Sequence, residues 1–207
     1  MTIIDKLATS LGRKDEAPNQ ELAQYIASED DRGAVKELVD NLYNRDKNIQ
    51  SDCIKVLYEI GDFKPSLIAE YVNEFVALLD HRNNRLVWGA MTALDAITLE
   101  NPEAIYSTLA KIVDVADNGS VITRDHGVRI LIKLCSVQPY ADHAFDLLVQ
   151  QLKICPTNQL PMYAENAVSI VNDANRAVFI ETLLSRLDDI EKDTKRKRVE
   201  KLIKKLS

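Results

Sequence analysis

Glycine and proline are scarce in this sequence, with six of each among 207 residues. Sheet-rich folds need many tight turns, and these two residues supply much of the turn chemistry. Hydrophobic residues make up 46% of the chain and charged residues 28%, which is ordinary for a globular protein. The composition therefore favours a helical globular fold.

Long apolar runs and cysteine pairs are also missing. No segment approaches the ~18 apolar residues that cross a bilayer, and Asp5 and Lys6 interrupt the apolar core that an amino-terminal signal peptide would need. Three cysteines (Cys53, Cys135 and Cys155) lie far apart and form no CxxC pair typical of a zinc site. We expect a soluble cytoplasmic protein with reduced thiols, no metal, no cofactor and no membrane contact.

Catalytic motifs are absent as well. The sequence contains no HExxH, GxSxG, GxxxxGK or GxGxxG. His126 follows Asp125, but adjacent residues on a helix point in different directions, so an unrelated surface pair is the simpler interpretation. We therefore expect no enzymatic activity.

Negative charge dominates everywhere except near the carboxyl end. The formal net charge is −6, yet residues 192–205 contain eight basic and two acidic residues, a local excess of +6 that leaves −12 for the rest. Phosphate repulsion by such an acidic body opposes binding of nucleic acid along the chain. Nucleic acid is thus a disfavoured partner, and a protein partner is expected.

Three prolines reveal an internal repeat. Pro65, Pro102 and Pro139 are spaced by 37 residues. Proline suits the first turn of a helix, where its missing N–H is not needed, and Asn101 is a suitable N-cap before Pro102. We expect each of these prolines to open a repeat.

The same offset of 37 residues aligns a column of small side chains: Cys53, Ala90, Gly127 and Ala164. A small residue on an apolar helical face lets the partner helix approach closely. Polar turn residues at 117–120 separate two helical patterns within one repeat. We expect one domain over 1–207, with amino-terminal helices in 1–27 and two-helix repeats near 28–64, 65–101, 102–138, 139–175 and 176–207.

This pattern resembles the HEAT family, whose repeats are helical hairpins with a proline near the start, a polar turn and a small residue in the second helix. The resemblance covers residues 28–207 and rests on residue types rather than on a diagnostic string. It implies an all-α, right-handed superhelix of about five repeats, an armadillo-like solenoid, whose second helices line a concave binding face. A non-catalytic scaffold or adaptor for a protein partner is the function that it implies.

Candidate contact residues are those that flank the apolar stripe of the second helices. Trp88 is the only tryptophan, and Trp and Arg are enriched at binding hot spots. Trp88 has two interpretations: an exposed anchor for a partner peptide, or a side chain that fills a groove between repeats. The candidates are Lys55, Arg85, Trp88, Asp125, Arg129, Met162 and Tyr163.

The basic helix expected near the carboxyl end has apolar residues at helical spacing, so one face docks while the other is charged. It either caps the last repeat with a polar surface, or it contacts an acidic partner or nucleic acid. Its candidate contact residues are Lys195, Arg196, Arg198 and Lys201.

The alternative function is that of a HEAT-like DNA-binding protein or of a HEAT-like alkylpurine DNA glycosylase. In that family an aromatic residue precedes a catalytic Asp by one helical turn, whereas here Thr92 lies one turn after Trp88. The carboxylate that would stabilise a developing cation is missing from that position, although Asp95 or Asp125 could substitute for it.

Overall fold

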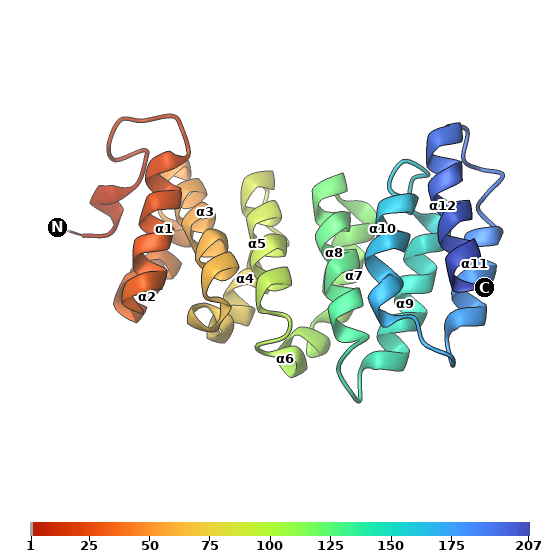
Figure 1. Cartoon of the computed structure of the whole chain (residues 1–207). Coiled ribbons are helices and arrows are strands. Elements are labelled where there is room, and N and C mark those ends of the chain that lie inside the picture. Colours follow the sequence, from red (N-terminus) through yellow and green to blue (C-terminus); the bar gives the residue numbers. More distant parts are fainter. Residues whose placement is uncertain (1) are drawn as a thin grey trace. The chain divides into compact units, whose positions relative to one another are not determined.

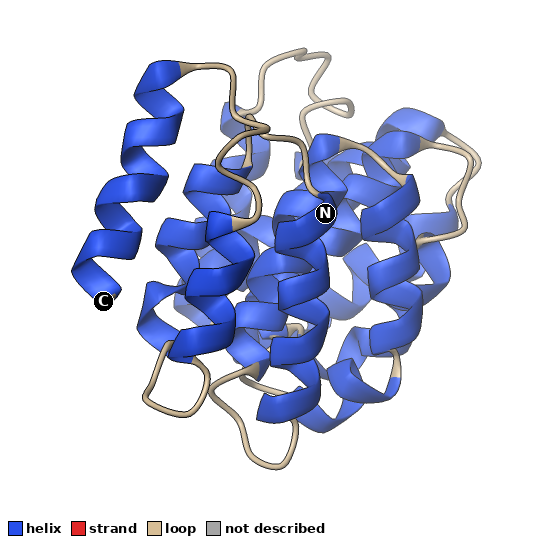
Figure 2. Cartoon of the chain, turned by 90° about the vertical axis from the view of Figure 1, so that its right-hand side faces the viewer, coloured by secondary structure: helices blue, strands red, loops and turns tan. Residues whose placement is uncertain are grey.

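The computed structural model describes residues 2–207, and all regular secondary structure within this range is helical (Figures 1 and 2). The elements in chain order are η1 (Ile4–Lys6), α1 (Ala17–Glu29), α2 (Arg32–Asp40), η2 (Asn41–Tyr43), α3 (Lys47–Phe63), η3 (Pro65–Leu67), η4 (Ala69–Tyr71), α4 (Val72–Leu78), α5 (Asn84–Ile97), α6 (Pro102–Ser107), α7 (Leu109–Asn118), α8 (Val121–Leu134), α9 (Ala141–Ile154), α10 (Leu160–Ala167), η5 (Val168–Ile170), α11 (Arg176–Leu184) and α12 (Asp193–Leu206). The all-α prediction is confirmed.

Two compact units make up the chain: unit 1 spans Met1–Gly127 and unit 2 spans Val128–Ser207, so the division falls inside α8. In unit 1, α3 packs against α1, α2 and α5, while α4 packs against α5. In unit 2, α12 packs against α10 and α11, and α9 packs against α11. The expectation of a single domain over 1–207 stays a prediction.

Helix starts follow local capping chemistry. Asp31, Asp46 and Asn83 each accept a hydrogen bond from a backbone N–H in the first turn of α2, α3 and α5. Asn101 Oδ1 accepts from Ala104 N at 3.4 Å, so the expected cap of α6 is present. These four side chains set where α2, α3, α5 and α6 begin.

The three repeat-spaced prolines play different roles. Pro102 begins α6, whereas Pro65 begins the short 3-10 helix η3. Pro139 lies in the turn before α9, two residues ahead of its first residue. Proline fits the first turn of a helix at Pro65 and Pro102, and the expectation that each of the three prolines opens a repeat stays a prediction.

Small residues allow helices of unit 1 to pack closely. Cys53 and Ala90 are fully buried. A Cβ on Gly127 would lie 2.6 Å from Ala116 Cβ, and one on Gly89 would lie 2.4 Å from Ile54 Cγ1. Because real Cβ atoms do not approach so closely, glycine is needed at both positions where α5 meets α3 and α8 meets α7.

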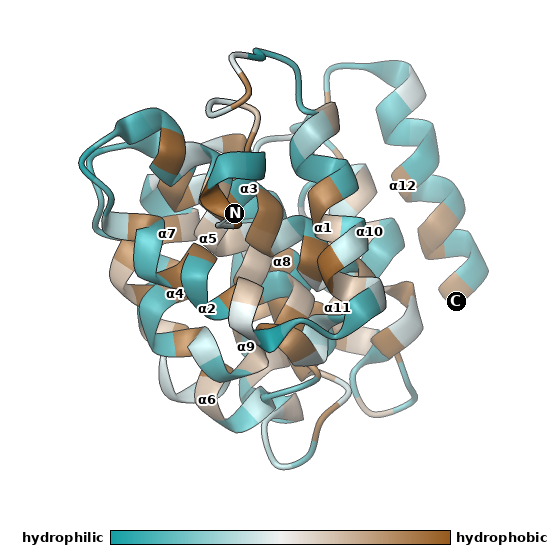
Figure 3. Cartoon of the chain, turned by 90° about the vertical axis from the view of Figure 1, so that its left-hand side faces the viewer, coloured by the Kyte–Doolittle hydropathy of each residue, from teal (hydrophilic) through white to brown (hydrophobic). Residues whose placement is uncertain are grey.

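Unit 2 has its own apolar core, formed by large side chains such as Phe179 and Leu148, both fully buried. In Figure 3, α12 carries apolar residues along a largely polar helix. Val199 and Leu202 are the buried residues of α12, and they fix it against the unit. No helix within residues 2–207 combines the length and the apolar character that a membrane crossing requires.

Candidate peptide-binding groove

A groove of about 790 Å³ lies in unit 1. Its walls come from three places: the segment 8–16 before α1, the exposed side of α3, and the exposed side of α5. Ile122, at the start of α8, lines it as well. The volume falls in the range of sites that hold a small molecule or part of a peptide.

Trp88 lies on α5 within this groove and is half-buried. Within residues 2–207 its indole N–H has no hydrogen-bond acceptor. Ile122 lines the same groove and is 41% exposed. An aromatic ring with a free donor, in a groove that also presents an exposed aliphatic side chain, is a suitable anchor for an apolar residue of a partner.

The segment 8–16 is held against α1 and α3 by buried hydrogen bonds, at the N-terminal end of α1 (Figure 1). Asp52 accepts from the backbone N of Thr9 at 2.8 Å and from Asn19 Nδ2 at 2.9 Å. Asn19 is 2% exposed, and its Oδ1 accepts from Ala8 N at 2.9 Å. Since the buried polar groups are paired, the segment forms a fixed wall of the groove.

Lys55 is a wall residue rather than a free contact. Its Nζ lies 2.5 Å from Glu59 Oε1 and 2.9 Å from Glu16 Oε2, and 4.9 Å from the Tyr58 ring centroid. Burial opposes its charge, but the hydrogen bonds that Lys55 forms with Glu59, Tyr58 and Glu16 raise the pKa of Lys55 above its usual value. Lys55 therefore stays charged and ties the segment 8–16 to α3.

A hydrogen-bonded chain of three side chains lies beside the groove. His126 Nδ1 is 2.8 Å from Asp95 Oδ2, and His126 Nε2 is 3.0 Å from Thr92 Oγ1. Thr92 Oγ1 donates to the backbone oxygen of Trp88 at 2.9 Å. The hydroxyl has one proton, and donating it to the Trp88 carbonyl leaves none for His126, whereas a nucleophilic hydroxyl must donate its proton to its base. The chain acts as a brace between α5 and α8.

Sequence reasoning missed this brace. It considered only the neighbour Asp125 and interpreted the two as an unrelated surface pair, whereas His126 contacts Asp95, which is 5% exposed and lies 31 positions earlier. The sequence indicated only that residues on the second helices of adjacent repeats can contact each other. Nothing in the spacing distinguished Asp95 and His126 from other pairs.

The structure separates the predicted contact residues. Lys55, Arg85 and Trp88 line the groove of unit 1, while Asp125 is half-buried on α8 and does not line it. The remaining three candidates, Arg129, Met162 and Tyr163, belong to unit 2.

Tyr163 corrects one expectation. Its side chain is 1% exposed and forms part of the core of unit 2, so it presents no surface to a partner. Tyr163 and Gly89 occupy the same position in their repeats, next to the column of small residues. At this edge of the helix interface a side chain packs inward, even when it is a large aromatic ring. Met162 is half-buried and Arg129 is exposed.

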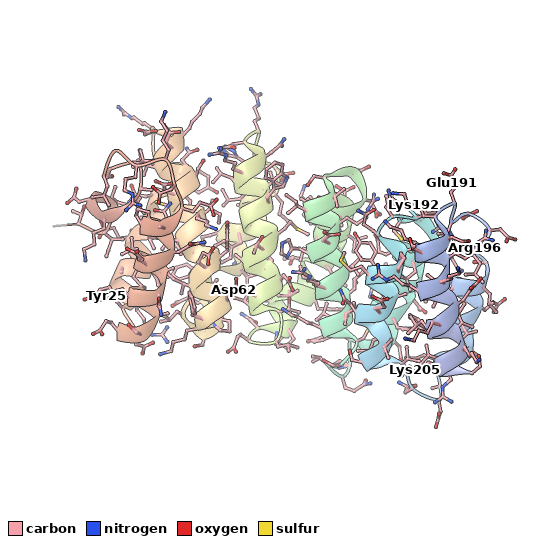
Figure 4. The ribbon with its side chains drawn as sticks, turned by 45° about the horizontal axis from the view of Figure 1, so that its top comes forward. Tyr25, Asp62, Glu191, Lys192, Arg196 and Lys205 are labelled. Carbon is pink, nitrogen blue, oxygen red and sulfur yellow. The ribbon has the colours of Figure 1, made fainter. Side chains whose placement is uncertain are left out.

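The basic helix α12 uses much of its charge within unit 2. Arg198 forms two hydrogen bonds with Glu165, at 2.9 and 2.5 Å, and Lys195 Nζ donates to Asn158 O at 2.8 Å. Arg196 lies 3.9 Å from Asp188. Lys201 is exposed and forms no ion pair with any residue in 2–207. Figure 4 shows Lys192 and Arg196 toward one end of α12 and Lys205 toward the other.

All three cysteines are free thiols. Burial raises the pKa of Cys53 and that of Cys135 to about 12. Cys155 is 1% exposed. Thiols in such surroundings are unreactive and act as small apolar side chains. Among residues 2–207, no group of three or more His, Cys, Asp or Glu side chains has an arrangement that could hold a metal ion.

Comparison with solved structures relates this architecture to known proteins. No protein-family model matches the sequence, and no curated protein matches it. The chain is similar to a designed armadillo repeat protein in complex with the peptide (KR)4, with 16% identity and a TM-score of 0.65 over 91% of this chain and 87% of that one. It is also similar to an engineered protein, with 20% identity and a TM-score of 0.64 over 100% and 98% of the two chains.

A third similar structure is a computationally designed armadillo repeat protein for modular peptide recognition, with 14% identity and a TM-score of 0.64 over 99% and 98% of the two chains. At identities this low, the structural similarity establishes a shared fold, and function must be argued from the site. The chain therefore has an armadillo/HEAT-like helical repeat fold.

Proposed function

We propose that this protein is a non-catalytic scaffold whose unit 1 groove binds a peptide segment of a partner protein. The observation that carries this proposal is Trp88, half-buried with an unused indole N–H in a groove that the exposed Ile122 also lines. Buried aromatic anchors surrounded by polar groups supply most of the binding energy of many interfaces. The proposed contact residues are Arg85, Trp88 and Ile122, with Lys55 positioning the wall.

The comparisons support a peptide as the ligand. Of the similar structures, one is described as a complex with the peptide (KR)4 and another as designed for modular peptide recognition. Helical repeat proteins present extended surfaces, and an extended peptide can follow such a surface over several side chains. A groove with a rigid wall also lowers the entropy cost of binding on the protein side.

No observation favours the DNA glycosylase alternative. Asp95 is buried and faces His126, so its carboxylate is not presented to a ligand in the groove. Asp125 does not line the groove. We retain the proposals that the protein has no enzymatic activity and that it resides in the cytoplasm, the latter supported by three free cysteines.

Selection from a library of random peptides tests the proposed function. Immobilised wild-type protein should enrich peptides that are lost when the same selection uses Trp88→Ala. Tyr43→Ala is the matched control, because Tyr43 is 59% exposed in the same unit and does not line the groove. Circular dichroism establishes that both variants are folded. Failure to enrich any peptide, or enrichment that Trp88→Ala leaves unchanged, would contradict the proposal.

A further inference from the structure

We propose that the peptide bound in this groove is acidic, and that its carboxylates contact a cluster of unpaired cations beside Trp88. This inference rests on the proposed function and adds the chemical class of the partner. The four cations are Lys14, Lys47, Arg82 and Arg85. We name this set the cation cluster.

The cation cluster lies along two adjoining hollows. Lys14 and Arg85 line the groove, while Lys47, Arg82 and Arg85 line a second hollow of about 740 Å³. Asn48, Ser51 and Arg85 line both, so the two are contiguous. All four cations are exposed, and none forms an ion pair within residues 2–207. A ligand extending from Trp88 past Arg85 would therefore meet free positive charge.

The acidic residues that line the same hollows are already engaged. Asp15 forms hydrogen bonds with Arg13 at 2.9 and 2.7 Å, and this contact lowers the pKa of Asp15. Glu16 pairs with Lys55, and Asp80 pairs with Lys111. Asp52 accepts from Thr9 and Asn19. Asp52 keeps its charge because both of its donors are neutral, but the two hollows are lined by six basic and four acidic residues, so the net charge that a ligand meets is positive.

Two of the four cations lie where a positive charge is unfavourable for the free protein. Lys47 is the first residue of α3, and Arg85 is the second residue of α5. The N-terminal end of a helix carries a partial positive charge, so cations there are repelled and anions are stabilised. A carboxylate bound between these helix starts would relieve the repulsion. Such placement is expected of a binding site and not of a surface selected for stability.

A peptide fits the surroundings better than a nucleic acid does. Unit 1 contains 22 acidic and 13 basic residues, a net charge of −9, which would repel a long phosphate backbone on either side of the cluster. Trp88 and Ile122 add an apolar contact that suits an aliphatic side chain. A segment with carboxylates and apolar residues in alternation matches both features.

Three short capped peptides provide the test: glutamate alternating with leucine, and the same peptide with lysine or with serine in place of glutamate. Trp88 is the only tryptophan, so its fluorescence reports occupation of the groove directly. At low ionic strength we expect the glutamate peptide to bind about tenfold tighter than the serine peptide, and the lysine peptide to bind weakest. Added salt should reduce the difference.

Variants locate the contact. Arg85→Gln should weaken the glutamate peptide several-fold and leave the serine peptide unchanged. Arg32→Gln is the matched control, because Arg32 is exposed in the same unit and lines neither hollow. Because Arg85 is repelled by the start of α5, Arg85→Gln should also raise the melting temperature of the free protein slightly.

The outcomes separate this inference from the proposed function. Equal binding of all three peptides, or tightest binding of the lysine peptide, leaves the groove as a peptide site and overturns the acidic preference. A preference that persists in Arg85→Gln also overturns the assignment. No binding of any peptide contradicts both. Displacement of the glutamate peptide by a short poly-dT oligonucleotide would assign the cluster to phosphate and overturn a peptide partner.

Discussion

Unit 1 and unit 2 differ in where their charge is available. Unit 1 has a net charge of −9, yet four of its unpaired cations line the groove and the adjoining hollow. Unit 2, with 10 acidic and 13 basic residues, has a net charge of +3, yet Lys195, Arg196 and Arg198 of α12 contact residues of their own unit. Net charge is thus a poor guide to the charge that a partner meets, because local pairing decides which side chains remain free.

The largest expected effect compares thiol reactivity in the two units. Cys53 lies in unit 1 and Cys135 in unit 2, and burial raises both pKa values from 9.0 to about 12. At neutral pH this lowers the thiolate fraction about a thousandfold. Single-cysteine variants that retain one or the other should therefore react with iodoacetamide very slowly while folded and rapidly in denaturant.

The same thiols predict a pH dependence of stability. A folded-state pKa raised above the unfolded value stabilises the fold below the unfolded pKa. The free energy of unfolding should therefore fall as the pH rises from about 9 toward 12.

In the alkylation experiment, a rapid reaction of only one single-cysteine variant would show that one unit opens independently, which would sharpen the comparison. A rapid reaction of both variants would contradict the burial of the thiols.

The brace between α5 and α8 comes next. His126→Ala removes the hydrogen-bond partner of the buried Asp95, and leaving a buried carboxylate without that partner should cost about 3 kcal/mol. Urea denaturation measures the loss. Hydrogen exchange should show lower protection in α5 and unchanged protection in α12. Equal loss of protection in both helices would contradict an effect confined to unit 1.

Close packing of α3 and α5 gives a somewhat smaller effect. Gly89→Ala places a Cβ 2.4 Å from Ile54 Cγ1, and overpacking of this kind should destabilise unit 1 by about 1–3 kcal/mol. Gly33→Ala in α2 is the control: its nearest neighbour is the side-chain oxygen of Asp31 at 3.3 Å, so it should change stability by about 1 kcal/mol or less. Thermal denaturation of the two variants distinguishes them. Equal melting temperatures would contradict the tight contact.

The smallest effect concerns α12. Arg198 lowers the pKa of Glu165 through its hydrogen bonds, so the pair stabilises unit 2 above the unfolded pKa of Glu165 and this contribution is lost as the pH falls below it. Both side chains are nearly half exposed, and solvent screens the pair. Arg198→Ala should therefore cost at most about 1 kcal/mol at neutral pH. A larger loss, measured by urea denaturation, would show that α12 depends on this contact more than the geometry indicates.

The repeat was predictable from the sequence because the same packing requirement recurs in each repeat and selects the same type of residue. Cys53, Ala90 and Ala164 recur at one offset since each lets a neighbouring helix approach, and all three are fully buried. Asn101 was predictable as a cap because its role is local. Signals that depend on spacing or on immediate neighbours can be read from one sequence.

The candidate site was only partly predictable. Trp88 was predicted because it is the only tryptophan and flanks the apolar stripe, and Arg85 because it lies one turn before Trp88; both line the groove. The wall formed by the segment 8–16 was not foreseen, because Asp52 and Asn19 hold it through contacts that no periodicity marks. The cation cluster was also missed, since only three-dimensional pairing shows which charges are left free.

Backbone amide chemical shifts test the central claim most directly. The labelled protein is titrated with the peptide of alternating glutamate and leucine. We predict that perturbations concentrate at the starts of α3 and α5 and at the indole N–H of Trp88, while amides of α12 stay unchanged. Perturbations centred on α12, or none at the groove, would contradict the account that the acidic unit, and not the basic one, carries the binding surface.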